Sequence, residues 1–312
     1  MNLSASPWIV AVILGLVALS PARAGMTPEE VKAFESYKAQ AEKGDPFAQF
    51  CLGYCYANGE GVAKDSVQAV SWYRKAAEQG SGTAQHNLGL FYAKAKDSVQ
   101  AVSWFRKAAE QGLARSQCNL GFCYAKGEGV AKDSVQAVSW YRKAAEQGDG
   151  WSQYNLGFCY ANGEGVAKDS VQAVSWYRKA AEQGHGWSQH NLGLCYANGE
   201  GVAKDFVQAV SWYRKAAEQG LAPSQSNLGY CYENGTGVAK DEIEAYAYYN
   251  LAGITQDIAR ENLAILEKKM SSDARLLGQQ RTKQLQKEIE GRLETLDDLR
   301  KAVEKESLRK GI

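Results

Sequence analysis

The chain has 312 residues, with 36 Lys and Arg against 35 Asp and Glu, and its formal net charge is +1. This balance gives no electrostatic reason to expect a nucleic-acid partner, because phosphate contacts require a surplus of basic side chains. The 31 glycines recur at regular positions, so they mark the ends of structural elements and do not indicate disorder.

The N-terminal segment has the pattern of an export signal. An apolar run from Trp8 to Leu19 is followed by Ser20-Pro21 and by Ala22-Arg23-Ala24, which fits a small-residue cleavage site. A membrane span needs about 20 apolar residues, and this run is shorter. We therefore expect a signal peptide at 1–24, cleaved after Ala24, a secreted or periplasmic protein, and no membrane contact after cleavage. Because no Lys or Arg precedes the run, an uncleaved anchor remains the alternative.

A first helix is expected next, over residues 25–43. Thr27 and Glu30 form a capping-box pattern, and Pro28 suits the first helical position. The apolar positions are like those of the second helix in the repeats that follow. The segment is therefore predicted to cap the N-terminal end of the array.

From Gly44 onward the chain repeats one sequence unit six times, at 44–79, 80–111, 112–147, 148–183, 184–219 and 220–255. A repeat of this length is typical of a solenoid, in which each unit buries its apolar face against its neighbours. The apolar residues recur at helical spacing throughout. The predicted fold class is therefore all-α, with stacked helix-turn-helix units.

Each unit is expected to form two helices, here called helix A and helix B. In the first copy, Asp45 caps helix A, Gly59 ends it, Asp65 caps helix B and Gly80 ends the unit. Glycine also follows the leucine of helix A in every copy, although it costs about 1 kcal/mol relative to alanine inside a helix. At Gly53 this indicates a close crossing of helices, with Ala69 and Ala76 as the expected small partners.

The complete pattern resembles a known family. The repeated unit contains, in order, Leu-Gly-x-x-Tyr, Asn-Gly-x-Gly-Val, Asp and Ala-x-x-Trp-Tyr-x-x-Ala-Ala-x-x-Gly. This pattern is similar to the Sel-one-like repeat (SLR), a relative of the tetratricopeptide repeat. The resemblance covers residues 44–255. It implies a right-handed superhelical solenoid that binds proteins or peptides, and it does not imply catalysis.

Two copies depart from the pattern. The second copy has Tyr92 to Asp97 in place of the Gly-x-Gly-Val connection, so a tightened or locally distorted turn is expected there. In the last copy Tyr248 stands where the other copies have Trp, which is typical of a terminal repeat that meets a cap. Residues 256–312 lose the period and are expected to form a capping helix and a charged helical tail.

The charged tail allows two interpretations. Ile289, Leu296 and Val303 are spaced by seven residues, which is a weak coiled-coil pattern. The tail is either a solvated charged helix or a helix that binds a partner or mediates self-association through residues 271–310.

The seven cysteines are expected to be buried thiols, with disulfides as the alternative. Five occupy the same position of successive copies: Cys55, Cys123, Cys159, Cys195 and Cys231. Equivalent residues of packed helices lie about 8–10 Å apart. A disulfide requires Cα atoms within about 7 Å.

Variation between the copies concentrates at three positions of helix A: five and two residues before the leucine, and two residues after it. These positions share one face of a helix, and in the similar tetratricopeptide repeat the same offsets line a concave groove that holds peptides. Aromatic anchors are frequent in binding sites. The alternative is that these side chains fill a tight interior. The predicted partner-binding groove consists of Phe47, Phe50, Tyr54, His86, Arg115, Phe122, Trp151, Tyr154, Phe158, Trp187, His190 and Tyr230.

No constellation of catalytic, cofactor or metal residues is apparent. The three histidines are His86, His185 and His190, and their spacing does not suit a tetrahedral metal site. The sequence therefore predicts a non-catalytic scaffold or regulator for a protein or peptide partner. The alternative is a cell-wall-associated protein that binds or hydrolyses peptidoglycan or β-lactams, because some secreted relatives are associated with β-lactam binding. Those relatives carry paired cysteines within each repeat, and this chain lacks them.

Overall fold

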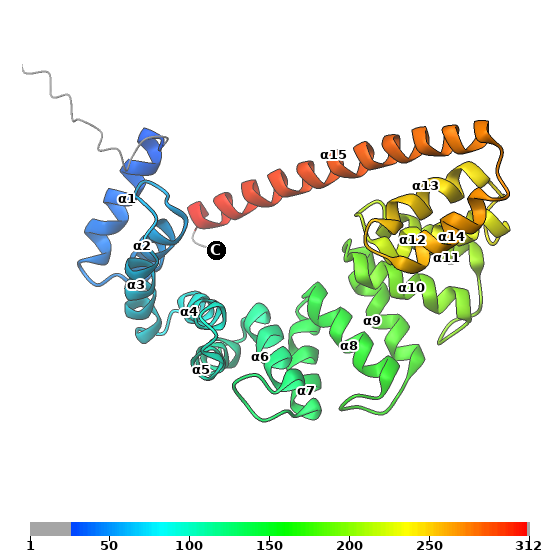
Figure 1. Cartoon of the computed structure of the whole chain (residues 1–312). Coiled ribbons are helices and arrows are strands. Elements are labelled where there is room, and N and C mark those ends of the chain that lie inside the picture. The colour runs from blue at the N-terminus through cyan, green and yellow to red at the C-terminus, as the bar shows by residue number, and fades with distance from the viewer. Residues whose placement is uncertain (1–25, 311–312) are drawn as a thin grey trace, which may run out of the picture. The chain divides into compact units, whose positions relative to one another are not determined.

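The computed structural model describes residues 26–310, which form fifteen helices and no strand (Figure 1). Consecutive helices pack in pairs, so the predicted all-helical repeat solenoid is confirmed. The chain divides after Gln79 into two compact units, each built from the same kind of helix pair. The predicted signal peptide and its cleavage site lie outside the described residues.

Every copy of the repeat contributes one helix A and one helix B. The helices A are α2 (Pro46–Asn58), α4 (Gly82–Lys94), α6 (Ala114–Lys126), α8 (Gly150–Asn162), α10 (Gly186–Asn198) and α12 (Ala222–Asn234). The helices B are α3 (Ser66–Glu78), α5 (Ser98–Glu110), α7 (Ser134–Glu146), α9 (Ser170–Glu182), α11 (Phe206–Ala217) and α13 (Glu242–Gly253). They are preceded by α1 (Pro28–Ala41) and followed by α14 (Asp257–Glu267) and α15 (Ser272–Lys310).

The helix ends lie where capping residues place them. Asp65 caps α3 by accepting hydrogen bonds from the backbone of Val67 and Gln68, and an aspartate caps each of the other helices B. Gly59 ends α2 in the left-handed conformation, with φ of 82°. In the shortened second copy no glycine is available, and Lys96 adopts φ of 62° between α4 and α5. The tighter turn therefore uses a non-glycine residue in a left-handed conformation.

The close crossing within each repeat is made by glycine against an aromatic ring. A Cβ atom added at Gly157 would lie 2.8 Å from ring atoms of Tyr177. In the first copy the added atom at Gly53 would lie 2.7 Å from the Tyr73 ring and 3.1 Å from the Ala69 carbonyl oxygen. The expected partner Ala69 is therefore present at the crossing through its backbone, but the nearest atoms belong to the ring of Tyr73. The glycine provides room for a large buried tyrosine, which stabilises the pair by burying aromatic surface.

A second glycine sets the spacing between neighbouring repeats. In the connection of the fourth copy, a Cβ atom at Gly165 would lie 2.1 Å from the backbone oxygen of Ser134, the first residue of α7. Gly129 has the same relation to Ser98, and Gly201 to Ser170. The Gly-x-Gly-Val connection of each of these repeats therefore lies directly on the backbone of the preceding helix B. No side chain fits between them.

A buried glutamine of helix A joins three helices. Gln153 Nε2 donates to the Ala145 carbonyl at the end of α7, and its Oε1 accepts from Gln183 Nε2 after α9. Gln117 and Gln189 form the same two bonds in their repeats. Each glutamine is only 4% exposed, so its bonds satisfy polar groups that would otherwise be buried without partners.

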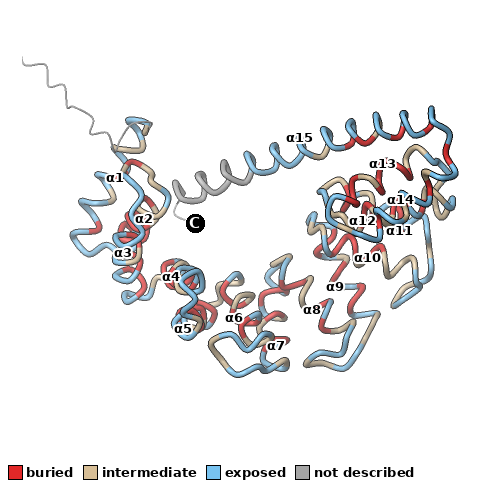
Figure 2. The backbone as a smooth tube through the Cα atoms, viewed as in Figure 1, coloured by how far each residue is buried: buried red, intermediate tan, exposed pale blue. Residues whose placement is uncertain are grey.

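The C-terminal helices cover the last repeat. Leu285 of α15 is buried in a cluster with Tyr248 and Leu251 of α13. The helix α14 also packs against α13. A Cβ atom at Gly278 would meet the Tyr246 ring at 2.6 Å, so α15 approaches α13 closely. Residues 291–299 of α15 are exposed, and Figure 2 shows that, within residues 272–299, the buried positions lie in the first part of this helix.

The seven cysteines are present as free thiols. Five are buried, and Cys118 and Cys195 are partly buried. Burial raises the pKa of the Cys51 and Cys55 thiols to about 12, so both are protonated at neutral pH. They pack as small apolar side chains in the core beside Leu52.

Candidate functional site

The variable face of helix A, defined by the three positions that differ between copies, is exposed at several large side chains. Exposed fractions reach 57% for Trp151 on α8, 42% for Trp187 on α10 and 43% for Phe122 on α6. Four further side chains of this face are exposed by 40–56%: Phe47 on α2, Leu90 on α4, Phe158 on α8 and Tyr230 on α12. Arg115 is exposed as well, while Tyr54 and Tyr154 are half-buried.

Three of the predicted residues lie between helices instead of in the open. Phe50 is 9% exposed and packs its ring 5.8 Å from that of Tyr73. His86 and His190 are each 8% exposed, and the Nδ1 atom of each is hydrogen-bonded to a buried serine of the following helix A. At these three residues the side chain is packed between helices. This agrees with the alternative interpretation, in which side chains of the variable face fill a tight interior.

An aromatic cluster connects α8 with the start of α10. The Trp151 ring lies edge-on against His185, with centroids 4.5 Å apart, and Tyr154 lies 5.1 Å from the same imidazole. His185 also caps α10, because its Nδ1 accepts a hydrogen bond from the backbone of Ser188 at 3.2 Å. Burial lowers the pKa of His185, which keeps the imidazole neutral in this role. Sequence reasoning did not include His185 in the face.

A pocket of about 490 Å³ opens on the variable face between α4, α6 and α8. Phe122 and Trp151 provide apolar walls, and Arg115, Asn119 and Asn155 provide polar groups. A volume of this size is typical of sites for small ligands or single peptide side chains. Four of the predicted residues line this pocket: His86, Arg115, Phe122 and Trp151.

The asparagines of this pocket were missed by the sequence analysis. An asparagine precedes the leucine of helix A in five copies: Asn87, Asn119, Asn155, Asn191 and Asn227. They lie outside the variable positions, because five of the six copies share the asparagine. Asparagine is a poor helix former, and its repetition inside helices was the signal that could have identified them.

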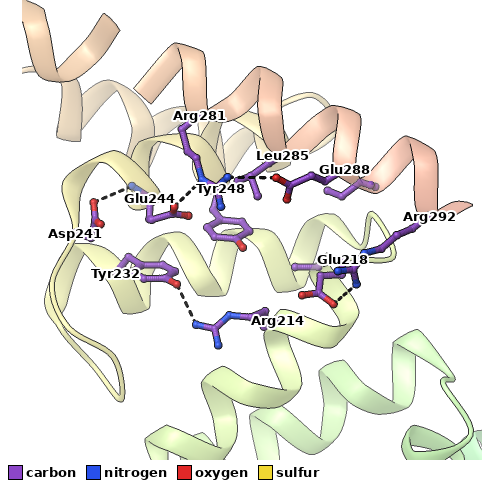
Figure 3. Close-up of a pocket in the computed structure, with 12 residues that line it drawn as sticks. Arg214, Glu218, Tyr232, Asp241, Glu244, Tyr248, Arg281, Leu285, Glu288 and Arg292 are labelled. Atoms are coloured by element: carbon purple, nitrogen blue, oxygen red, sulfur yellow. Dashed lines mark hydrogen bonds and ion pairs between the residues drawn. The ribbon is translucent and has the colours of Figure 1, made fainter. Parts of the chain in front are cut away.

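A second pocket, of about 380 Å³, lies between α11, α12, α13 and α15 (Figure 3). Its charged side chains are paired: Arg281 Nε lies 2.6 Å from Glu244 Oε1, and Arg292 Nη1 lies 2.5 Å from Glu218 Oε2. Arg214 donates to the Tyr232 hydroxyl at 3.0 Å. These contacts hold α15 on the last two repeats, so we interpret this pocket as part of the cap and not as a ligand site.

Within residues 26–310, no group of three or more His, Cys, Asp or Glu side chains could hold a metal ion. Burial lowers the pKa of His86 and His190 to about 4, so both imidazoles are neutral at pH 7. Each is also occupied by its serine partner. None of the described helices is long and apolar enough to cross a membrane.

Stacked helix pairs with an exposed variable face define a helical-repeat solenoid of the kind that serves as an interaction scaffold. The chain belongs to the Sel1 repeat family, whose sequence pattern matches residues 46–81, 82–113, 114–149, 152–185, 188–221 and 222–253. Sel1 repeat proteins generally act as scaffolds in protein–protein interactions. A comparison with curated proteins gives no match.

Solved structures of similar proteins have the same fold. A protective antigen of uropathogenic Escherichia coli strains, which displays an SLR fold, is 37% identical with a TM-score of 0.73. The alignment covers 80% of this chain but only 56% of that protein, so this chain spans little more than half of its length. A Sel1 repeat protein from Oxalobacter formigenes is 34% identical with a TM-score of 0.68, and the alignment covers 76% of this chain and 70% of that one.

Proposed function

We propose that the protein is a non-catalytic scaffold or regulator that binds a protein or peptide along the concave groove formed by the variable face of its helices A. The observation that carries the proposal is the row of exposed large side chains on successive helices, above all Trp151 and Trp187. Exposed apolar side chains gathered on one surface mark interaction sites, and aromatic rings bury a large area at low entropic cost.

Panning a random peptide library on the protein tests this function. Peptides selected by the native chain are expected to lose at least about tenfold in affinity when Trp151→Ala and Trp187→Ala are combined, because both anchors are removed. The control is Val135→Ala with Val171→Ala. These valines are each 65% exposed but lie at the start of helices B, so affinity is expected to stay unchanged. An equal loss of peptide affinity in the tryptophan and valine variants, or no loss in either variant, would contradict the proposal.

The lack of catalysis is part of the same proposal. It is supported by the neutral, serine-bonded state of His86 and His190 and by the family's general role as scaffolds. Incubation with a chromogenic β-lactam provides the test. Turnover or covalent labelling would favour the cell-wall-active alternative instead.

The proposed location is outside the cytoplasm, in the periplasm or secreted. The support is the apolar run from Trp8 to Leu19 with the small-residue site ending at Ala24. Expression of the full chain followed by N-terminal sequencing is expected to find Gly25 as the first residue. An intact Met1 in a membrane fraction would support the uncleaved anchor.

Self-association is proposed for the exposed end of α15 only. Leu285 and Ile289 pack against the repeats, whereas the same helix continues with Leu293, Leu296 and Leu299, which are 43–57% exposed. Light scattering on the full chain and on a chain ending at Arg292 compares their masses. A larger mass that disappears on truncation supports the proposal, and identical monomeric masses would refute it.

A further inference from the structure

We propose that the pocket between α4, α6 and α8 binds a carboxylate side chain of an acidic peptide, with an adjacent apolar side chain against Phe122 and Trp151. This inference rests on the proposed function, because the pocket is part of the variable face. It adds the chemical class of the ligand at one position of that face.

The first observation concerns charge. Arg115 is exposed, lines the pocket and forms no ion pair or side-chain hydrogen bond among the described residues. Asp149, the other charged residue of the pocket, is already engaged, because its Oδ1 accepts from the backbone of Ser152 at 2.7 Å as the cap of α8. The cap also places this carboxylate at the positive end of the helix dipole. The guanidinium of Arg115 is therefore the charged group of this pocket that has no hydrogen bond or ion pair among the described residues, and its geometry favours a planar anion.

The second observation is an asparagine, Asn119, that follows a helix B without a tyrosine at the corresponding position. Asn191 and Asn227 each interact with the hydroxyl of a tyrosine in the preceding helix B, Tyr177 and Tyr213, and lower its pKa. At the corresponding position before Asn119 the chain has Phe105, which carries no hydroxyl. The half-buried carboxamide of Asn119 forms no hydrogen bond among the described residues and lines the pocket beside Arg115. Its NH₂ group is thus available as a second donor to the same anion.

The third observation is the neutral, apolar character of the rest of the pocket. Burial and, secondarily, the charge of Arg115 lower the pKa of His86 to about 4, so this imidazole adds no charge at pH 7. Phe122 and Trp151 are 43% and 57% exposed and border the polar groups. An anion next to an apolar group therefore fits this pocket better than an isolated inorganic ion.

The test uses the full chain and two short probes, N-acetyl-phenylalanyl-glutamyl amide and its glutaminyl counterpart. Nuclear magnetic resonance follows the Arg115 Nε–H and Trp151 indole N–H signals, which are assigned by Arg115→Gln and Trp151→Phe. The glutamyl probe is expected to shift both signals and to bind about tenfold more tightly than the glutaminyl probe, as expected for a charge-assisted bidentate contact. Equal binding of the two probes, or the absence of any shift, would overturn the proposal.

Variants separate the roles of the two polar groups. Arg115→Gln is expected to abolish the preference for the glutamyl probe, whereas Lys132→Gln, which removes the same charge from an exposed residue outside the pocket, leaves it unchanged. Phe105→Tyr restores the residue that most other copies contain. It is expected to weaken binding about threefold, because the new hydroxyl competes for Asn119. A preference that survives in Arg115→Gln would refute the assignment.

Asp149→Ser tests the sign of the ligand's charge. Serine caps the equivalent helix α4 at Ser81, so the substitution keeps a cap while removing a negative charge. Binding of the glutamyl probe is expected to become tighter, because a like charge near the bound carboxylate is removed; weaker binding would contradict the proposed anion site. A phosphoseryl probe that binds better than the glutamyl probe would replace the carboxylate as the ligand class. Because these probes report on the pocket alone, the outcome is independent of the peptide-panning result.

Discussion

The Nδ1 atom of His86 on α4 lies 2.8 Å from the Oγ atom of Ser116 on α6, and both side chains are buried. His190 and Ser224 repeat this relationship between α10 and α12 at 2.9 Å. A neutral imidazole thus joins neighbouring repeats at two places in the array. Protonation of either ring would place a charge in a site with no acidic partner at hydrogen-bond distance among the described residues.

These histidines make stability depend on pH. Their pKa is about 4 in the folded chain against 6.5 in the unfolded chain, so the unfolded state binds more protons between these values. The free energy of unfolding is therefore expected to be highest above pH 6.5 and to fall as pH drops towards 4, by about 3 kcal/mol for each histidine. Urea unfolding monitored by circular dichroism at pH 7 and pH 4.5 measures the loss.

Replacement by the residues of other copies provides the control. His86→Phe and His190→Tyr introduce side chains that occupy this position at Phe50 and Tyr154. The double variant is expected to lose most of the pH dependence between 6.5 and 4. An unchanged dependence would assign it to other groups.

The glycine of the helix A crossing is expected to tolerate no side chain. Gly157→Ala places a Cβ atom 2.8 Å from the Tyr177 ring and should destabilise the chain by about 1–3 kcal/mol, despite the better helix propensity of alanine. Gly150→Ala is the matched control, because this residue lies in the same helix with no atom within 4 Å of the added carbon. Thermal unfolding should show a neutral or stabilising effect there. Similar destabilisation by both variants would contradict the packing argument.

The connection between repeats should be more sensitive than the repeat boundary. Both Gly165 and Gly148 have positive φ, but only at Gly165 would a Cβ atom meet the Ser134 backbone, at 2.1 Å. Gly148→Ala is expected to cost about 1 kcal/mol of backbone strain. Gly165→Ala adds a steric clash with the backbone of α7. The denaturant midpoint of this variant should therefore fall clearly further than that of Gly148→Ala. A reversed order of the two midpoints would refute this view of the connection.

The two parts of α15 should differ in their contribution to stability. Leu285→Ala removes a side chain that is 6% exposed against α13 and is expected to cost about 2–5 kcal/mol. Leu296→Ala changes a side chain that is 54% exposed on the same helix and should change the unfolding free energy by less than about 0.5 kcal/mol. The unfolding free energies of both variants are measured at a protein concentration low enough to prevent association. The difference then reports only on the packing of α15 within its own chain. A large effect of Leu296→Ala under these conditions would show that the cap extends further along the helix.

The sequence by itself determined the repeat, the two helices of each copy and their ends, because aspartate caps, left-handed glycines and helical spacing act within a few residues of the chain. It also identified the variable face, since exposed Trp151 and Trp187 share one side of neighbouring helices. Only the tertiary structure showed that His86 and His190 are buried against Ser116 and Ser224. It also showed that Asn119 lies beside Arg115 with no hydrogen-bond partner in the part of the chain that the structure describes. These relationships join residues about thirty positions apart or more, or depend on a missing hydroxyl at Phe105. A helical period determines which side of a helix a residue occupies, but only the packing of neighbouring helices decides which atoms meet there and which remain free for a ligand.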